Sequence, residues 1–572
     1  MSDTTKPELR PGAQQRSPST EAALPGFVPW PPEFAETYRR KGYWQGRTLG
    51  QELDDWAQRY GERIAVVSGD ERVSYRELKS RAENVAVGLA ALGIGPRDRV
   101  IVQLNNVPEF FYLVFGLFKL GALPVMALPA HRETEIRYLL EFSEAVAYCS
   151  PKSFRDFDYV AMVQSIAPQL PTLKHLLVVG PEAPPGTVSI EAMVRAKPKN
   201  VAEVLSRHVP KASDVAFFLL SGGTTGLPKL IPRTHDDYSY NFRAAAEACG
   251  MTGDSVYLIA LPMSHNLPLC APGSMGTFSV GAKVVLAQSP NPDVAFPIIE
   301  RERVTITAQV PAVTIQWLDS PLRGQYDLSS LKLLQVGGSR LNDEVARRVK
   351  PLLGTTLQQA FGMAEGFISF TRSDDPEELI CTTQGRQMTE ADEVLVVGLD
   401  GEPAALGETG ELLTRGPYTI RGYYKAPEHN AKSFTADGFY RAGDLVRMLP
   451  SGNLTVEGRV KDLINRGGEK IAAEEVENLI LAHASVHNVA VVAMPDAILG
   501  EKICAYVVCR PGQSLTLEAL RSFLEGAKIA RFKLPERLEL IDALPLTSVG
   551  KISKKHLRED IAAKLRAEGT LK

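Results

Sequence analysis

Apolar runs rich in β-branched residues recur between about residue 50 and residue 450, and stretches with helical spacing separate them. Examples of these runs are residues 100–104, 176–179, 283–286, 305–308 and 333–336. Short apolar runs that alternate with helices are typical of parallel strands buried on both faces. The pattern therefore predicts an α/β fold in which helices cover parallel sheets.

One apolar segment, residues 110–129, is about as long as a bilayer span. Lys119 lies at its centre, and Gly116, Gly121, Pro124 and Pro129 interrupt it. We therefore predict a short helix followed by a strand in a buried core, and no membrane insertion.

The hydrophobic pattern changes near Lys461, where a second, compact domain is predicted to begin. Residues 474–480 have the spacing of an amphipathic helix, and residues 489–494 and 503–509 read as strands. The predicted organisation is a disordered tail over residues 1–25, a large N-terminal domain over 26–460 and a small C-terminal domain over 461–572. No internal repeat is found.

Composition limits the class of protein. A chain of 572 residues exceeds what one hydrophobic core usually supports, so two or more domains are expected. With 44% hydrophobic residues, 23% charged residues and a net charge of -3, the chain is predicted to bind neither nucleic acid nor membrane. The first 25 residues lack the apolar core of a secretory signal, and the six cysteines form no C-x-x-C pair. These features favour a cytoplasmic protein without a disulfide framework or a zinc site.

The stretch from Ser221 to Lys229, Ser-Gly-Gly-Thr-Thr-Gly-Leu-Pro-Lys, suits a loop that wraps a polyphosphate. Its glycines allow backbone N–H groups to approach anionic oxygens, its hydroxyls donate hydrogen bonds, and Lys229 adds positive charge. It is not a Walker loop, because Leu227 and Pro228 separate Gly226 from Lys229. The apolar run at 215–220 reads as a buried strand before the loop, and residues 234–241 are predicted to start a helix after it.

The loop is one of an ordered series of motifs. The others are Val-Ser-Tyr-Arg-Glu-Leu (73–78), Lys-Leu-Gly-Ala (119–122), Phe-Gly-Met-Ala-Glu-Gly (361–366), Gly-Glu-Leu (410–412), Tyr-Arg-Ala-Gly-Asp-Leu (440–445), Gly-Arg-Val-Lys-Asp (458–462) and Pro-Leu-Thr-Ser-Val-Gly-Lys-Ile (545–552). In order and spacing the chain resembles the adenylate-forming superfamily of acyl-CoA synthetases, firefly luciferases and nonribosomal peptide adenylation domains. The resemblance covers nearly everything after about residue 35.

The resemblance implies a large N-terminal domain of stacked αβ subdomains with a small β-barrel portion near residues 395–413, and a small mobile α+β lid. It also implies ATP and Mg²⁺ as cofactors, and two half-reactions for which the lid docks in two orientations. The first half-reaction joins a carboxylic acid to AMP with release of pyrophosphate, and the second transfers the acyl group to a thiol.

Site residues follow from the same resemblance. The predicted ATP-binding residues are Ser221, Gly222, Gly223, Thr224, Thr225, Gly226, Lys229, Gly338, Ser339, Phe361, Asp444 and Arg459. The predicted catalytic residues are Lys551, His265 and Glu365, of which Glu365 is also the predicted metal ligand. Lys461 is the predicted hinge, and Gly467 and Gly468 are predicted to let a pantetheine arm pass. For Phe361, plain core packing remains an alternative.

Residues 265–273, His-Asn-Leu-Pro-Leu-Cys-Ala-Pro-Gly, resemble the signature of stand-alone aryl-acid adenylating enzymes of siderophore pathways. These enzymes activate salicylate or 2,3-dihydroxybenzoate and load a separate phosphopantetheinylated aryl carrier protein. The predicted aryl-acid-binding residues are His265, Asn266, Leu267, Ala271, Gly338, Ala360, Ile368 and Lys551. Amino-acid-activating relatives have aspartate in place of Asn266, whereas a neutral amide suits an ortho-hydroxyl.

Ala271 departs from the dihydroxybenzoate pattern, which has serine at this position, and from the salicylate pattern, which has cysteine. Since alanine cannot pair with a ring 3-hydroxyl, its presence favours salicylate. The neighbouring Cys270, a bridging water and the space beside Ala360 leave 2,3-dihydroxybenzoate open.

Three other functions share parts of this pattern. An aryl-CoA ligase would use the same ATP residues and differ only in its thiol acceptor. A degenerate adenylate-binding scaffold is disfavoured because Lys229, Glu365, Asp444, Arg459 and Lys551 are all present. A luciferase-like oxygenase has no supporting feature in the sequence.

Overall fold

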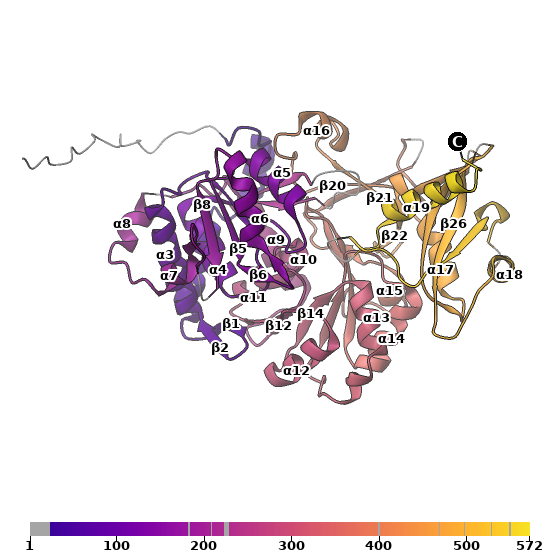
Figure 1. Cartoon of the computed structure of the whole chain (residues 1–572), viewed down its shortest axis with the longest axis horizontal. Helices are drawn as coiled ribbons and strands as arrows, with labels where there is room; N and C mark the ends of the chain where they lie inside the picture. Colours follow the sequence, from indigo (N-terminus) through magenta and orange to yellow (C-terminus); the bar gives the residue numbers. More distant parts are fainter. Residues whose placement is uncertain are drawn as a thin grey trace, which may run out of the picture.

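The computed structural model describes residues 23–180, 183–207, 209–221, 228–398, 401–467, 469–496, 498–527, 529–547 and 551–571 (Figure 1). Most of the predicted tail, the predicted phosphate-loop residues 222–226 and the predicted pantetheine residue Gly468 therefore lie outside the described part of the chain. Leu24, inside the predicted tail, packs against a core cluster.

The largest sheet has nine strands in the order β18-β17-β16-β15-β14-β12-β13-β1-β2. Its six central strands, from β16 to β1, pair in parallel, and β2, β17 and β18 add antiparallel edges. The strands are β1 (Ile64–Ser68), β2 (Glu71–Ser74), β12 (Val256–Ile259), β13 (Lys283–Leu286), β14 (Ile306–Gln309), β15 (Leu333–Val336), β16 (Thr356–Gly362), β17 (Ile368–Phe370) and β18 (Arg386–Gln387). Because the carboxyl ends of β14, β15 and β16 share one edge, the segments that follow these strands lie together.

A second, seven-stranded sheet has the order β11-β10-β4-β3-β5-β8-β9. It is parallel except for the β10–β11 pair, which is an antiparallel hairpin. The strands are β3 (Arg99–Val102), β4 (Leu123–Met126), β5 (Ala147–Pro151), β8 (His175–Val179), β9 (Val188–Ser189), β10 (Val215–Leu220) and β11 (Leu230–Thr234). The predicted strands at 100–104, 176–179, 215–220, 283–286, 305–308 and 333–336 are confirmed to within two residues.

Helices α2 (Leu49–Tyr60), α3 (Tyr75–Ala91), α4 (Glu109–Leu120), α9 (His235–Ala248) and α11 (Gly273–Ser279) contribute to a shared core with strands of both large sheets. The Trp56 ring lies about 6 Å from the rings of Phe115, Phe242 and Phe278, so it ties α2 to α4, α9 and α11. The apolar segment predicted as helix then strand forms α4 and β4, and no helix of the described ranges is long and apolar enough to cross a membrane. Lys119 ends this helix as a buried cation, and its Nζ lies 2.6 Å from Asp54 Oδ1.

The remaining helices of this part are short surface elements or cover the sheets. They are α1 (Pro32–Arg40), α5 (Glu133–Ser143), α6 (Tyr159–Ile166), α7 (Ile190–Arg195), α8 (Val201–Ser206), α10 (Asn266–Cys270), α12 (Pro292–Glu302), α13 (Pro311–Asp319), α14 (Asp343–Leu353), α15 (Glu377–Thr382) and α16 (Pro427–Ser433), with 3₁₀ turns η1 (Ala167–Gln169) and η2 (Pro321–Gly324) and the small β6 (Ser153–Phe154) and β7 (Phe157–Asp158) pair.

The region predicted to supply a small barrel is a four-stranded antiparallel sheet. Its strands are β19 (Glu393–Val397), β20 (Thr409–Arg415), β21 (Tyr440–Met448) and β22 (Leu454–Arg459), and they pair in sequence order. In Figure 1 strands β20 to β22 lie between the N-terminal sheets and the C-terminal domain. This sheet therefore carries the chain toward the second domain.

The C-terminal domain has its own five-stranded sheet. The elements of this domain are η3 (Val460–Asp462), β23 (Leu463–Arg466), β24 (Glu469–Ala472), α17 (Ala473–Leu481), β25 (Val486–Asp496), β26 (Gly500–Cys509), α18 (Leu517–Gly526), η4 (Arg531–Lys533), β27 (Arg537–Leu540) and α19 (Lys554–Ala567). One face of β25 and β26 packs on α17 and α18 and the other on α19, as the period of two in a strand requires. The predicted helix at 474–480 and the predicted strands at 489–494 and 503–509 are confirmed. The boundary at residue 461 stays a prediction.

Candidate functional site

The ends of the predicted phosphate loop are held together at the mouth of the β10–β11 hairpin. Ser221 N–H donates to Lys229 O at 3.0 Å, and Lys229 N–H donates to Ser221 Oγ at 2.9 Å. The Lys229 ammonium lies 5.7 Å from the centre of the Tyr423 ring. The hairpin thereby fixes both anchor residues of the loop and places the lysine beside Tyr423.

Glu365 is a buried carboxylate that is only 8% exposed. The Tyr423 hydroxyl donates to its Oε1 at 2.7 Å, and the Tyr440 hydroxyl lies 2.9 Å from the Tyr423 hydroxyl. Burial, followed by the Glu365 charge, raises the pKa of Tyr423 well above its usual range, so this phenol remains a donor. The tyrosine pair holds one carboxylate oxygen, and no described residue forms a hydrogen bond with the other, Oε2.

That free oxygen is compatible with a hard cation. Mg²⁺ in nucleotide enzymes is commonly held by one or two carboxylates together with substrate phosphates and waters. Within the described ranges there is no group of three or more His, Cys, Asp or Glu residues that could hold a metal ion. A metal at Glu365 would therefore depend on phosphate oxygens for most of its ligands.

Arg233 positions the segment that carries Glu365. It is fully buried, and its NH2 nitrogen lies 2.7 Å from Asp237 Oδ1 at the start of α9. It also donates to the backbone oxygens of Ala364 at 2.9 Å and Tyr418 at 3.2 Å. The guanidinium thus connects α9 to the residue just before Glu365 and to the chain that follows β20.

Asp444 and Arg459 face each other across the four-stranded sheet. They are register partners of β21 and β22, and Arg459 Nε donates to Asp444 Oδ1 at 2.8 Å. Asp444 is buried, and the hydrogen bond from Arg459 leaves its second oxygen able to accept from another donor. This is the arrangement a ribose-binding carboxylate needs.

Two adjacent glycines after β15 join the predicted aryl pocket to the predicted catalytic lysine. A Cβ on Gly337 would lie 3.0 Å from Ala360 O and 3.6 Å from Leu267 Cδ2. Gly338 has φ of +87°, and a Cβ there would lie 3.6 Å from Lys551 Cε. A side chain at either glycine would occupy this junction.

Lys551 reaches this junction from the C-terminal domain. Its backbone N–H donates to Thr547 Oγ1 at 3.1 Å, and Thr547 N–H donates to Lys551 O at 2.6 Å, so these two residues hold each other in place. Burial, and then the nearby charge of Arg459, lower the pKa of Lys551 to about 8. Other contacts between the domains include α17 against β22, and Asn342 Nδ2 donating to Asn478 Oδ1 at 3.4 Å.

His265 and Asn266 begin helix α10. His265 caps the helix through Nδ1, which accepts from Leu267 N–H at 3.3 Å. Burial, and then the charge of Lys551, lower the pKa of His265 to about 4, so its ring is neutral at pH 7. Asn266 is buried, and its Oδ1 accepts from the Tyr238 hydroxyl at 3.0 Å.

The apolar residues predicted to contact the aryl ring come together in one cluster. Ala271, Ala360 and Ile368 pack with Ala245, Phe370, Met388 and Tyr418, and Leu267 lies against them. These residues come from α9, α10 and its end, β16, β17 and the segments that follow β18 and β20, so the cluster depends on the tertiary fold. Tyr418 closes it, since its hydroxyl accepts from Ile368 N–H and donates to Asp392 at 2.8 Å.

Other predicted residues have less distinctive surroundings. Phe361 is half-buried and packs edge-on against Phe367, with ring centres 6.3 Å apart, and Ser339 is exposed. Lys461 lies in η3, between the last strand of the core and the first strand of the C-terminal sheet. The Gly467 N–H donates to Leu499 O at 2.8 Å within the C-terminal domain.

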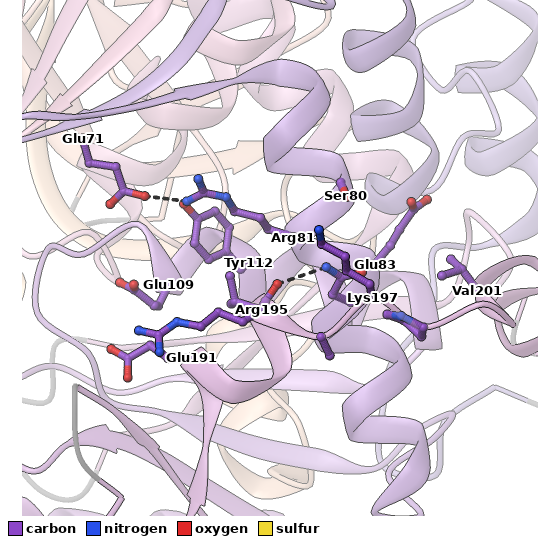
Figure 2. A pocket seen from close by; sticks show the side chains of 14 residues that line it. Glu71, Ser80, Arg81, Glu83, Glu109, Tyr112, Glu191, Arg195, Lys197 and Val201 are labelled. Carbon is purple, nitrogen blue, oxygen red and sulfur yellow. Dashed lines mark hydrogen bonds and ion pairs between the residues drawn. The ribbon is translucent and has the colours of Figure 1, made fainter.

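A cavity of about 850 Å³ lies apart from these residues (Figure 2). Segments of β2, α3, α4 and α7 line it, with carboxylates of Glu71, Glu109 and Glu191 and the cations of Arg81 and Arg195. No predicted site residue lies in its wall. The cavity is therefore not the predicted adenylation site.

Four residues that contribute to the site escaped the sequence predictions: Arg233, Tyr238, Tyr418 and Tyr423. Arg233 and Asp237 stand four positions apart across a strand-to-helix junction, which is a usable sequence signal. The three tyrosines carry no such signal, because a single tyrosine among apolar residues normally indicates that its ring packs in the core.

The model of the AMP-binding enzyme family matches residues 53–424, and that of the AMP-binding enzyme C-terminal domain matches residues 475–551. A protein of Bacillus subtilis (strain 168) named 2,3-dihydroxybenzoate-AMP ligase is 53% identical over 95% of this chain and 99% of its own length. A Streptomyces protein named salicylyl-CoA synthase / salicylate adenylyltransferase is 52% identical over 94% of this chain and 98% of its own. The apo structure of Mycobacterium smegmatis MbtA matches with a TM-score of 0.72 and 43% identity, covering 93% of this chain and 98% of that one.

Proposed function

Because the chain belongs to the AMP-binding enzyme family, we propose that it activates a 2-hydroxyaryl carboxylic acid with ATP and transfers the acyl group to a thiol. One observation carries the proposal: a Cβ on Gly337 would meet Ala360 and Leu267 of the apolar cluster, and a Cβ on the adjacent Gly338 would meet Lys551. An aromatic ring in the cluster would place its carboxylate at the lysine.

The first half-reaction needs positive charge around two anions. A carboxylate oxygen attacks the α-phosphorus of ATP in line, and pyrophosphate leaves. Lys551 would bind the carboxylate and the α-phosphate, while Lys229 lies at the phosphate loop and Arg459 beside the ribose carboxylate Asp444. A cation held by Glu365 would neutralise phosphate charge when bound. We include Mg²⁺ as that cation because Glu365 Oε2 is free and Mg²⁺ needs few protein ligands.

The identity of the acid follows from the polar and apolar groups around the cluster. Asn266 supplies a neutral amide instead of the carboxylate that would pair with an ammonium group, which argues against an α-amino acid. Ala271 has no group to pair with a ring 3-hydroxyl, and leaving that hydroxyl without a partner would cost about 1 to 3 kcal/mol. Salicylate is therefore the favoured substrate and 2,3-dihydroxybenzoate the second candidate. The named relatives include enzymes for each acid.

For the thiol acceptor we propose a separate phosphopantetheinylated aryl carrier protein. A relative in Mycobacterium tuberculosis named salicyl-AMP ligase / salicyl-S-ArCP synthetase supports this choice. Coenzyme A is the alternative, and the name of the Streptomyces relative supports it. All six cysteines are free thiols, which fits the reducing cytoplasm we propose as the place of the reaction.

The decisive experiment is pyrophosphate exchange into ATP, with salicylate, 2,3-dihydroxybenzoate, benzoate, anthranilate and several amino acids as substrates. Salicylate or 2,3-dihydroxybenzoate should exceed benzoate at least about tenfold in kcat/KM, which corresponds to about 1.4 kcal/mol. Asn266→Leu should bring that ratio close to one. A preference for benzoate or an amino acid in the wild type would overturn the substrate assignment.

Two further measurements separate the half-reactions. Lys551→Ala should lower adenylate formation about 100-fold or more, with little effect on thiol transfer from a preformed adenylate. Equal loss of both steps would remove Lys551 from this role. Comparing kcat/KM for coenzyme A with that for a loaded aryl carrier protein then identifies the acceptor.

A further inference from the structure

Tyr238 is held rigidly beside the predicted aryl pocket. It lies in α9 and is fully buried. Its ring meets Phe217 edge-on with centres 4.6 Å apart, and the Arg233 guanidinium lies 4.9 Å from its ring centre. These contacts on two sides fix the position of the phenol hydroxyl.

The hydroxyl has a definite direction in the hydrogen-bond network. It donates to Asn266 Oδ1 at 3.0 Å. The Cys270 side chain also interacts with this hydroxyl, and burial raises the pKa of Cys270 to about 12, so its sulfur remains a neutral thiol and a weak acceptor. The amide oxygen of Asn266 is therefore the preferred acceptor of the single phenol proton.

From this arrangement we infer that Tyr238 fixes the amide orientation of Asn266 and so makes the enzyme select a 2-hydroxy over a 2-amino aryl acid. The inference rests on the proposed function. With Oδ1 engaged by Tyr238, Asn266 presents its Nδ2 donor to the ortho substituent. A hydroxyl oxygen accepts that hydrogen bond, whereas the weakly basic aryl amine of anthranilate offers N–H donors and needs an acceptor.

The reverse orientation is disfavoured while Tyr238 is present. A flipped amide would donate its NH₂ group to the phenol oxygen, and the phenol proton would have to turn from the amide oxygen to the sulfur of Cys270, which is a weaker acceptor. Without the hydroxyl, neither orientation gains this bond. The amide can then turn its oxygen to the substrate, and the cost of accepting an amine falls.

Tyr238→Phe tests the inference because it removes only the hydroxyl. Tyr257→Phe is the matched control: Tyr257 is also fully buried, and its hydroxyl has no hydrogen-bond partner among the described residues. The assay is pyrophosphate exchange with salicylate, anthranilate and benzoate. We expect Tyr238→Phe to lower the salicylate-to-anthranilate ratio of kcat/KM about five- to tenfold, and Tyr257→Phe to leave it within about twofold.

The outcomes separate the inference from the proposed function. An unchanged ratio in Tyr238→Phe, or an equal loss with all three acids, would give Tyr238 a merely structural role and overturn the inference. A wild type that does not prefer salicylate to benzoate would overturn the proposed function and the inference with it. If Tyr238→Phe does not fold, Asn266→Asp replaces the donor by an acceptor directly, and the same fall in the ratio is expected; no fall would count against the inference.

Discussion

The buried lysine at the domain junction should set the upper pH limit of adenylate formation. In the proposed role, Lys551 must be protonated to bind a carboxylate and a phosphate, and in the free protein its pKa is lowered to about 8, first by burial and then by Arg459. About nine-tenths of the protein therefore carries this charge at pH 7, and about one-tenth at pH 9. We expect kcat/KM for ATP, measured at low aryl-acid concentration, to fall about tenfold per pH unit above pH 8.

The magnitude follows from the displacement of the pKa. A change from the usual 10.5 to about 8 means that keeping the charge in this site costs roughly 3 kcal/mol relative to water. Anions that bind beside Lys551 offset this cost, so they raise its pKa. The pH limit of kcat, which reports the complex, should therefore lie above that of kcat/KM.

Two variants test the assignment. Lys551→Arg keeps its charge beyond pH 12, so its rate should be lower but should not fall between pH 8 and 10. Glu474, on α17 at the domain interface, is the competing group, since burial raises its pKa to about 7. Glu474→Gln should keep the fall near pH 8. Lys551 does not set the upper pH limit if the fall in kcat/KM persists unchanged in Lys551→Arg or disappears in Glu474→Gln.

Three other predictions follow from single contacts. Tyr423→Phe removes the hydrogen bond to Glu365, which is worth about 1 to 2 kcal/mol. The Mg²⁺ concentration needed for half-maximal pyrophosphate exchange should therefore rise at least about fivefold. An unchanged midpoint would contradict the proposed role of Glu365. Ala271→Ser places a hydroxyl in the apolar cluster and should raise the ratio of 2,3-dihydroxybenzoate to salicylate in kcat/KM about five- to tenfold, with benzoate as control; no rise would place the ring 3-hydroxyl elsewhere. Burial raises the pKa of Asp392 to about 7, so between about pH 4 and 7 the native state holds a proton that the unfolded state has lost. The free energy of unfolding should therefore fall by up to roughly 4 kcal/mol as pH rises through that window. Asp392→Asn should lack this fall in thermal melts at pH 5 and 7.5, and parallel melting curves would refute the assignment.

Local patterns predicted the secondary structure well where burial is uniform. Strands such as β13 and β15 are short apolar runs that lack the spacing of an amphipathic helix. Thr234 caps α9, at the start of the polar segment for which the sequence predicts a helix. The pairing of these strands was harder to predict from the sequence. Nothing local indicates that β1 and β13, more than 200 residues apart, are neighbours in one sheet.

The same division applies to the site. Motif residues such as Glu365, Asp444 and Lys551 could be proposed as site residues because their chemistry is recognisable in a short string, and their roles stay predictions. The groups that aim them could not. Tyr423 and Arg233 act through distant partners, and a sequence does not indicate which buried hydroxyl or guanidinium will meet which backbone oxygen.

The low pKa of Lys551 also links chemistry to the position of the C-terminal domain. While ATP and the carboxylate are bound, their negative charge compensates the buried ammonium, and the domain gains from inserting it. After pyrophosphate leaves, the carboxylate charge is gone and the acyl-adenylate keeps a single negative charge on its phosphate, so most of that compensating charge is lost. The lysine must then lose its proton or leave the junction. Since Lys551 belongs to the C-terminal domain, the cost of its buried charge favours withdrawal of that domain at the stage when the thiol must reach the adenylate.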